Sequence, residues 1–253
     1  MKRYVVFSFD DGLKDFKDHA LPILDKYNLK ASINIISGFI DKSYQTDYPY
    51  LDVNDVKELQ KKGFEIANHT DSHLKHGSYN ELKTCNSKIN EWCKTDTVCG
   101  VVMPKYSKPS IDAQKFITEM KPPYISYEAQ RVITLCNIFS RLFWKFKTLI
   151  NKSEETVTTY SVQRKLYKKG KAGLIRRLEV GNAVDPDIIY KAIKSIRNGW
   201  CLTLCFHSIV EDINLTTYPK GAYTIKQFEE FCKLLSKDPD ICVITQLEAC
   251  SKK

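Results

Sequence analysis

Five side chains in this 253-residue sequence have the types and spacing needed for metal binding and proton transfer: Asp10, Asp11, His69, His73 and His207. His69 and His73 are four residues apart, so they could lie on one face of a helical turn and direct both imidazoles at one ion. A carboxylate from a different strand would complete a set of two histidines and one carboxylate, which leaves positions open for water and substrate. The adjacent carboxylate could accept a proton from that water, and His207 could act as an acid on the opposite side.

Each of these features also has an ordinary structural explanation. Asp10-Asp11-Gly12 is typical of a turn, the His-x-x-x-His spacing arises by chance, and a histidine after an apolar strand often packs or caps. The three features together favour a site because each follows an expected strand, and parallel β/α folds place active sites at the carboxyl ends of strands. His19 and His76 have no such setting and are expected on the surface.

Alternating strand and helix patterns supply those strand ends. Strands are expected at Tyr4–Phe9, Ala31–Ile36, Phe64–Ala67, Val98–Met103, Cys201–Phe206 and Cys242–Thr245. Helices are expected from Asp52, from about Asn80 to Cys93, over Asp185–Arg197 and over Gln227–Leu235. Six or seven parallel strands separated by helices indicate one α/β domain over residues 1–253, either a β/α barrel or a doubly wound sheet.

Residues 105–177 break this alternation and carry the net charge. The chain has 39 Lys and Arg against 30 Asp and Glu, a net charge of +9. Sixteen of the basic and five of the acidic residues lie in this segment, which makes it +11 and leaves the rest of the chain at −2. We interpret the segment as a basic, helical insertion in the barrel scaffold. Its apolar residues recur at helical spacing: Leu135, Ile138, Phe139, Leu142, Phe143, Phe146, Leu149 and Ile150.

Nothing in the sequence predicts export or a membrane span. There is no run of 18 apolar residues, and too few apolar residues precede Asp10 for a signal peptide. The nine cysteines are scattered without a C-x-x-C pair, which argues against a disulfide framework and a structural zinc site. We therefore expect a cytoplasmic protein with mostly buried thiols.

Three stretches around the candidate residues together resemble motifs of the polysaccharide deacetylase family with the NodB homology domain. They are Ser8-Phe-Asp-Asp-Gly12, His69-Thr-Asp-Ser-His73 and Leu202-Thr-Leu-Cys-Phe-His207, and the resemblance covers about residues 3–105 and 175–248. The resemblance implies a single distorted β/α barrel of about seven parallel strands.

The resemblance also implies a metal site and an acid–base pair. It places one divalent ion, usually Zn²⁺ with Co²⁺, Ni²⁺ or Mn²⁺ as alternatives, on Asp11, His69 and His73. It makes Asp10 the general base and His207 the general acid in hydrolysis of an acetamide, or less often an acetyl ester, on a sugar. A bound ion would acidify water and polarise the acyl oxygen, while the base and the acid manage the two proton transfers.

The third motif departs from the family's pattern. Members commonly have an Arg-x-Pro-Tyr type motif, in which the arginine orients the base and a backbone N–H helps to bind the oxyanion. The matching stretch, Val101-Val-Met-Pro-Lys-Tyr106, keeps Pro104 but has an apolar residue in the arginine's place. Lys105 stands in the tyrosine's place and Tyr106 follows it. A backbone donor remains available there, because N–H groups do not depend on side-chain identity.

The missing cation has a candidate later in the chain. We expect Arg177 to approach Asp10, with Arg176 or a purely solvated carboxylate pair as the alternatives, because adjacent residues of a strand face opposite ways.

The expected partner is an acetylated saccharide: a polysaccharide, an oligosaccharide or a glycan precursor. One alternative is a protein of the same fold that binds saccharide but has lost catalysis. Another is peripheral membrane binding by the basic amphipathic segment, including contact with a lipid-linked glycan at the inner membrane face. Packing of that helix on the barrel, with a solvated basic face, explains the same pattern more simply. Nucleic acid is not expected, because no binding motif accompanies the charge.

Overall fold

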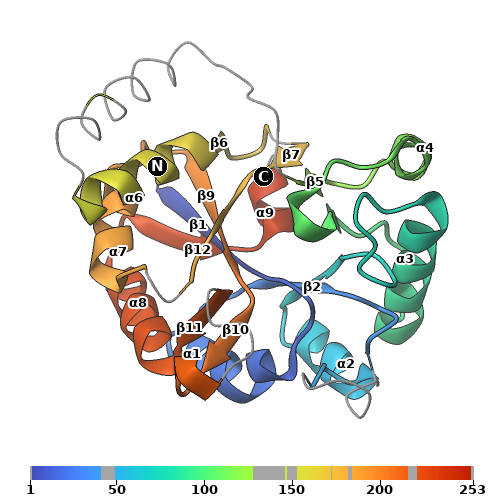
Figure 1. Ribbon diagram of the computed structural model, residues 1–253, viewed down its shortest axis with the longest axis horizontal. Helices are drawn as coiled ribbons and strands as arrows, with labels where there is room; N and C mark the ends of the chain where they lie inside the picture. Colours follow the sequence, from blue (N-terminus) through green and yellow to red (C-terminus); the bar gives the residue numbers. More distant parts are fainter. Residues whose placement is uncertain are drawn as a thin grey trace.

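A parallel sheet lies at the centre of the computed structural model, and helices surround it (Figure 1). The structure describes residues 2–40, 49–127, 146, 153–171, 173–181, 184–215 and 221–251. The strands are β1 (Arg3–Phe9), β2 (Ser32–Ile35), β3 (Glu65–Asn68), β4 (Val101–Val102), β5 (Ile125–Ser126), β6 (Tyr167–Lys168), β7 (Leu174–Ile175), β8 (Arg177–Glu179), β9 (Trp200–Phe206), β10 (Ser208–Val210), β11 (Ala222–Thr224) and β12 (Ile241–Ile244). The α-helices are α1 (Leu21–Lys26), α2 (Val53–Lys61), α3 (Tyr79–Cys93), α4 (Ile111–Met120), α6 (Glu154–Lys165), α7 (Pro186–Lys194), α8 (Ile225–Lys237) and α9 (Gln246–Cys250).

Strand pairing curls the sheet into a nearly closed barrel. Parallel ladders connect β9, β1, β2, β3, β4, β5 and β7 in that order. β8 follows β7 after a single residue, Arg176, and pairs in parallel with β9. The path β7–β8 therefore joins the two ends of the sheet, and the structure confirms the expected barrel over the doubly wound alternative.

Side chains alternate between the two faces of β1. Val5, Phe7 and Phe9 pack with the helices in the main apolar core, where the Phe9 ring lies 5.7 Å from that of Phe228 in α8. Ser8 and Asp10 face the barrel interior, where both receive hydrogen bonds from the Asn34 amide of β2 at 2.8 and 2.6 Å. Burial of the outer rings stabilises the fold, at about 1.5–3 kcal/mol for each large apolar side chain. The inner face is left free for polar side chains.

Most expected elements are present with shifted ends, and one strand is much shorter than predicted. Capping side chains begin the helices: Asp52 accepts the amide of Asp55 at α2, and Ser78 accepts that of Glu81 at α3. The strand expected over Val98–Met103 is limited to β4, because the amide of Cys99 donates to the side chain of Asn86 rather than to a neighbouring strand.

The basic segment 105–177 contributes barrel elements at both ends. Its first part forms α4 and β5, and its last part forms α6, β6, β7 and the first residue of β8. The amphipathic helix predicted around Leu135–Ile150 lies outside the described residues except for Phe146. Among the helices in the described ranges, none is long and apolar enough to cross a membrane. Of the eight cysteines among the described residues, five are buried and free, in line with the expectation of mostly buried thiols: Cys85, Cys99, Cys201, Cys205 and Cys232.

Candidate active site

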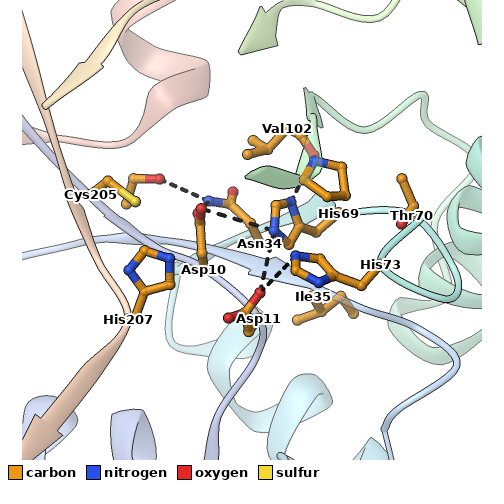
Figure 2. Close-up of polar contacts among 12 residues, drawn as sticks. Asp10, Asp11, Asn34, Ile35, His69, Thr70, His73, Val102, Cys205 and His207 are labelled. Carbon is orange, nitrogen blue, oxygen red and sulfur yellow. Dashed lines mark hydrogen bonds and ion pairs between the residues drawn. The ribbon is translucent and has the colours of Figure 1, made fainter. Parts of the chain in front are cut away.

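Four of the candidate side chains converge because their strands run in parallel and end at the same rim of the barrel. Asp10 and Asp11 follow β1, His69 follows β3 and His207 follows β9. Together with His73 they line one cavity of about 310 Å³, and Figure 2 shows them facing one another. The other lining residues are Leu13, Tyr50, Lys105, Tyr106 and Ser208.

The turn after β1 separates the two aspartates. Asp10 keeps the strand direction and its amide donates to the carbonyl of Phe206. Asp11 has a φ of 75°, a left-handed conformation that Asp tolerates better than most residues. The chain therefore reverses at Asp11, and the adjacent carboxylates face different neighbours: Arg177 for Asp10, and the two histidines for Asp11.

Asp11, His69 and His73 offer three ligand atoms that lie within 4.8 Å of one another. Oδ1 of Asp11 is 3.4 Å from Nε2 of His69 and 3.5 Å from Nε2 of His73. Nδ1 of His69 lies 2.7 Å from the carbonyl of Val102, so that nitrogen carries the proton and Nε2 keeps its lone pair for an ion. Oδ1 of Asp11 is buried and receives no hydrogen bond from the described residues.

This donor set fits a divalent metal ion. Two imidazole nitrogens and a carboxylate oxygen are zinc-type ligands, and three protein ligands leave positions for water and substrate. The nitrogen–oxygen distances of 3.4 and 3.5 Å are too long for strong hydrogen bonds, whereas they suit atoms that share one cation.

The two histidines converge through a loop, so the predicted helical turn is wrong. Thr70 and His73 have φ of 69° and 59°, which a right-handed helix excludes. The loop is held by its neighbours: Gly38 donates its amide to the carbonyl of Asp71 at 2.8 Å, and the Ser37 hydroxyl donates to the Asp71 carboxylate at 2.6 Å. The Glu81 carboxylate accepts the amides of Asp71 and Ser72.

Asp10 is buried against a cation from the other end of the barrel. Nη1 of Arg177 lies 2.6 Å from each of its carboxylate oxygens, and the Asn34 amide donates to Oδ1. Burial by itself raises the pKa of Asp10, but Arg177, His69, His207 and the Asn34 hydrogen bond together hold the pKa well below its usual range. Arg177, and not Arg176, faces Asp10, because β8 turns alternate residues inward.

His207 faces Asp10 from the side opposite the two histidines. Its Nδ1 lies 3.9 Å from Oε1 of Glu179, which is two residues after Arg177 on β8. Glu179 was not predicted from the sequence, although the Arg-Leu-Glu spacing puts both charges on one face of the strand.

The stretch of the altered third motif forms a tight turn at the cavity. Lys105 and Tyr106 both have φ of 52°, and both line the cavity, whereas Pro104 is buried beside them. The Tyr106 ring lies 5.0 Å from the Arg177 guanidinium, a cation–π contact.

The two remaining histidines differ from each other. His76 is exposed, as expected. His19 is only partly exposed, because its Nδ1 lies 2.6 Å from the carbonyl of Ile209. His19 therefore reaches the surface but also contacts β10, the strand that follows His207.

The protein is therefore a β/α barrel with a candidate metal site, Asp11–His69–His73, next to the buried carboxylate of Asp10 and the ring of His207. The polysaccharide deacetylase family model matches residues 1–114, which is less than half of the chain. This part of the chain is similar to polysaccharide deacetylases, and the barrel fits the NodB-type fold of their solved structures.

One curated relative is YxkH of Bacillus subtilis (strain 168), which is named for polysaccharide deacetylation. It is 34% identical over 73 residues, which are 29% of this chain and 24% of the relative. The chain thus aligns with about a quarter of that relative's length.

Solved structures show the same fold at low identity. A family 4 acetyl xylan esterase from Clostridium thermocellum, in complex with a cobalt ion, has a TM-score of 0.53 and 14% identity over 97% of this chain and 89% of its own. A peptidoglycan N-acetylglucosamine deacetylase has a TM-score of 0.53 and 15% identity over 96% and 86%. A mutant CE4-family pseudoenzyme with restored activity has a TM-score of 0.52 and 14% identity over 100% and 69%. The fold is therefore shared by active and inactive proteins, and activity has to be argued from the site.

Proposed function

We propose that this protein is a metal-dependent hydrolase that removes acetyl groups from N-acetylated sugars of a polysaccharide, an oligosaccharide or a glycan precursor. One observation carries the proposal: the Asp11–His69–His73 set and His207 flank the buried Asp10 within a single cavity. That arrangement puts a site for the ion, a base and an acid around the space that an acetamide would occupy.

Asp11, His69 and His73 would hold the ion. A divalent cation supplies Lewis-acid polarisation of the acyl oxygen and makes water more acidic. We propose Zn²⁺ as the ion, because two imidazoles and a carboxylate suit it, and the cobalt ion of the acetyl xylan esterase supports a divalent cation in general. The tautomer of His69 is fixed by Val102 before any ion binds.

Asp10 is placed to act as the base. Its low pKa keeps it ionised at neutral pH, and Arg177 with Asn34 fixes the direction of its oxygens. The carboxylate takes a proton from the attacking water as the water oxygen bonds to the acyl carbon. The pair with Arg177 makes Asp10 a weaker base than an isolated carboxylate, so positioning contributes more than basicity.

His207 is placed to act as the acid. As the carbon–nitrogen bond breaks, the ring donates a proton to the departing sugar nitrogen, which leaves acetate and a free amine. Oε1 of Glu179 lies 3.9 Å from its Nδ1, so the carboxylate favours the protonated ring electrostatically. The acyl oxygen needs a donor, and the left-handed turn at Lys105 and Tyr106 places backbone amides beside the cavity that can serve.

Metal-dependent acetate release tests this proposal. Protein loaded with one equivalent of Zn²⁺ is incubated with N-acetylated oligosaccharides and with O-acetylated xylan, and acetate is quantified. We expect release from the N-acetylated substrates that stops after chelation and in Asp11→Ala. Saccharide binding without acetate release from any substrate would support the non-catalytic alternative, and release that survives both treatments would exclude the assigned metal site.

A further inference from the structure

Lys105 is a cation at the mouth of the cavity. It is exposed and lines the cavity together with His73. In the part of the chain that the structure describes, no carboxylate forms an ion pair with it.

The backbone at Lys105 is held in a costly conformation. Lys105 has φ 52° and ψ 31°, and Tyr106 also has φ 52°. The left-handed conformation is unfavourable for residues other than glycine, so surrounding contacts must maintain the turn. The Ser107 hydroxyl and amide both donate to the carbonyl of Pro104, at 2.8 and 3.0 Å. The amide of His76 donates to the Ser107 hydroxyl at 2.9 Å, and the Tyr106 ring packs on Arg177.

This turn fixes where Lys105 sits relative to the ligand set. The loop that carries His73 is tied to it by the hydrogen bond from His76, so the two sides of the cavity mouth are one connected unit. Strain of this kind persists where a side chain or backbone group must occupy one particular place.

The charges of the site add to a positive total once an ion is bound. Arg177 neutralises Asp10, and a divalent ion exceeds the charge of Asp11 by one. Lys105 adds a further positive charge, and Glu179, partly exposed beside His207, removes one. The region on the His73 side of the cavity therefore attracts anions.

From these observations we propose that the substrate carries an anionic group, a carboxylate or a phosphate, next to the acetylated sugar position, and that Lys105 binds it. This inference rests on the proposed deacetylation and names the class of saccharide. Neutral chitin-like chains are then poorer substrates than acidic glycans or sugar phosphates. Lys105 acts as a specificity residue, since it contacts the substrate outside the reacting atoms.

Paired substrates with and without the charge test the proposal. N-acetylglucosamine, its 6-phosphate and N-acetylmuramic acid differ in charge and share the acetamide, and the two acids separate a phosphate from a carboxylate. We expect kcat/KM to be at least ~10-fold higher for one acid than for the neutral sugar, with the difference mainly in KM and reduced by salt. Lys105→Met should lower this preference about tenfold, and Lys105→Arg should restore it.

Lys108→Met is the matched control, because Lys108 is an exposed lysine three residues away that does not line the cavity. It should keep the preference. Equal kcat/KM for the acids and the neutral sugar would overturn the inference. So would a Lys105→Met variant in which kcat falls equally for all three sugars. Either result would leave the proposed deacetylation intact.

Binding separates this inference from the proposed function. In metal-loaded Asp10→Asn protein, the dissociation constants of the three sugars are compared with and without Lys105→Met. Tighter binding of an acid that is lost with Lys105→Met supports the inference even where the wild type releases no acetate. Identical dissociation constants with and without Lys105 would contradict it.

Discussion

Nη1 of Arg177 lies 2.6 Å from both carboxylate oxygens of Asp10, although the two residues are 167 positions apart. Both side chains are almost fully buried. The contact exists because β8 closes the barrel against β9, which pairs with β1. In this chain the cation that the third motif lacks comes from the closing strand.

Arg177→Met should destabilise the fold by about 3–5 kcal/mol, because it leaves a buried carboxylate without its partner. Asp10→Asn/Arg177→Met should recover much of that loss, since it removes both charges. Urea unfolding of the wild type, both single variants and the double variant measures the coupling. Additive losses would show that the pair does not interact in solution.

Gly38→Ala should weaken metal binding by about tenfold, an effect typical of the residues that support metal ligands. A Cβ at Gly38 would collide with the carbonyl oxygen of Asp71, in the loop between His69 and His73. Calorimetric Zn²⁺ titration provides the measurement. Gly173→Ala is the control, because among the described residues no atom beyond its chain neighbours lies within 4 Å of its added Cβ. Unchanged affinity in Gly38→Ala would mean that the loop tolerates displacement.

Metal affinity should fall as pH is lowered, because the ligand imidazoles must lose their protons to bind. Burial lowers the pKa of His69, but Asp10 and Asp11 outweigh it, and the net effect raises that pKa. As the pH falls, protonation of His69 therefore begins to compete with metal binding at a pH above about 6.5, the ordinary pKa of histidine. Metal content after dialysis at a series of pH values records the transition.

Asp15→Asn should stabilise the protein at pH 7.5 and have little effect near pH 4. Burial raises the pKa of Asp15 to about 6, against the opposing effects of Ser208 and His19. The folded state therefore binds a proton more tightly than the unfolded chain, and the ionised carboxylate costs stability as pH rises through 6. We expect a gain of about 1–3 kcal/mol at pH 7.5, measured by urea unfolding.

Asp18→Asn serves as the control for Asp15→Asn, because Asp18 is an exposed aspartate only three residues further along the chain. It should leave the pH dependence of stability unchanged. The raised pKa of Asp15 would be contradicted if the free energy of unfolding of the wild type rose between pH 5 and pH 7.5 and Asp15→Asn showed the same values.

The sequence predicts the barrel because hydrophobic runs and strand-end polar residues alternate along most of the chain. Phe7 and Phe9 signal a buried strand, and the caps Asp52 and Ser78 mark the helix starts within a residue or two. Short strands such as β4, β5 and β7 are set by tertiary pairing rather than by local pattern, so their bounds could not be predicted.

The site was predictable in its residue types more than in its geometry. The spacing pointed to His69 and His73, and the family resemblance to Asp11, but the left-handed residues Thr70 and His73 that bring the rings together leave no helical signature. Nothing local distinguishes Arg177 from Arg176, because the choice depends on which of them β8 turns inward.

Asp10→Asn tests the central claim most directly, because it changes the base and leaves the ligand set in place. Metal content and acetate release are measured on the same Zn²⁺-loaded sample. We predict one bound ion, as in the wild type, and a turnover lower by about 10²–10⁴-fold, the usual contribution of general-base catalysis. A full complement of metal with an unchanged rate of acetate release would contradict the assignment of Asp10 as the base.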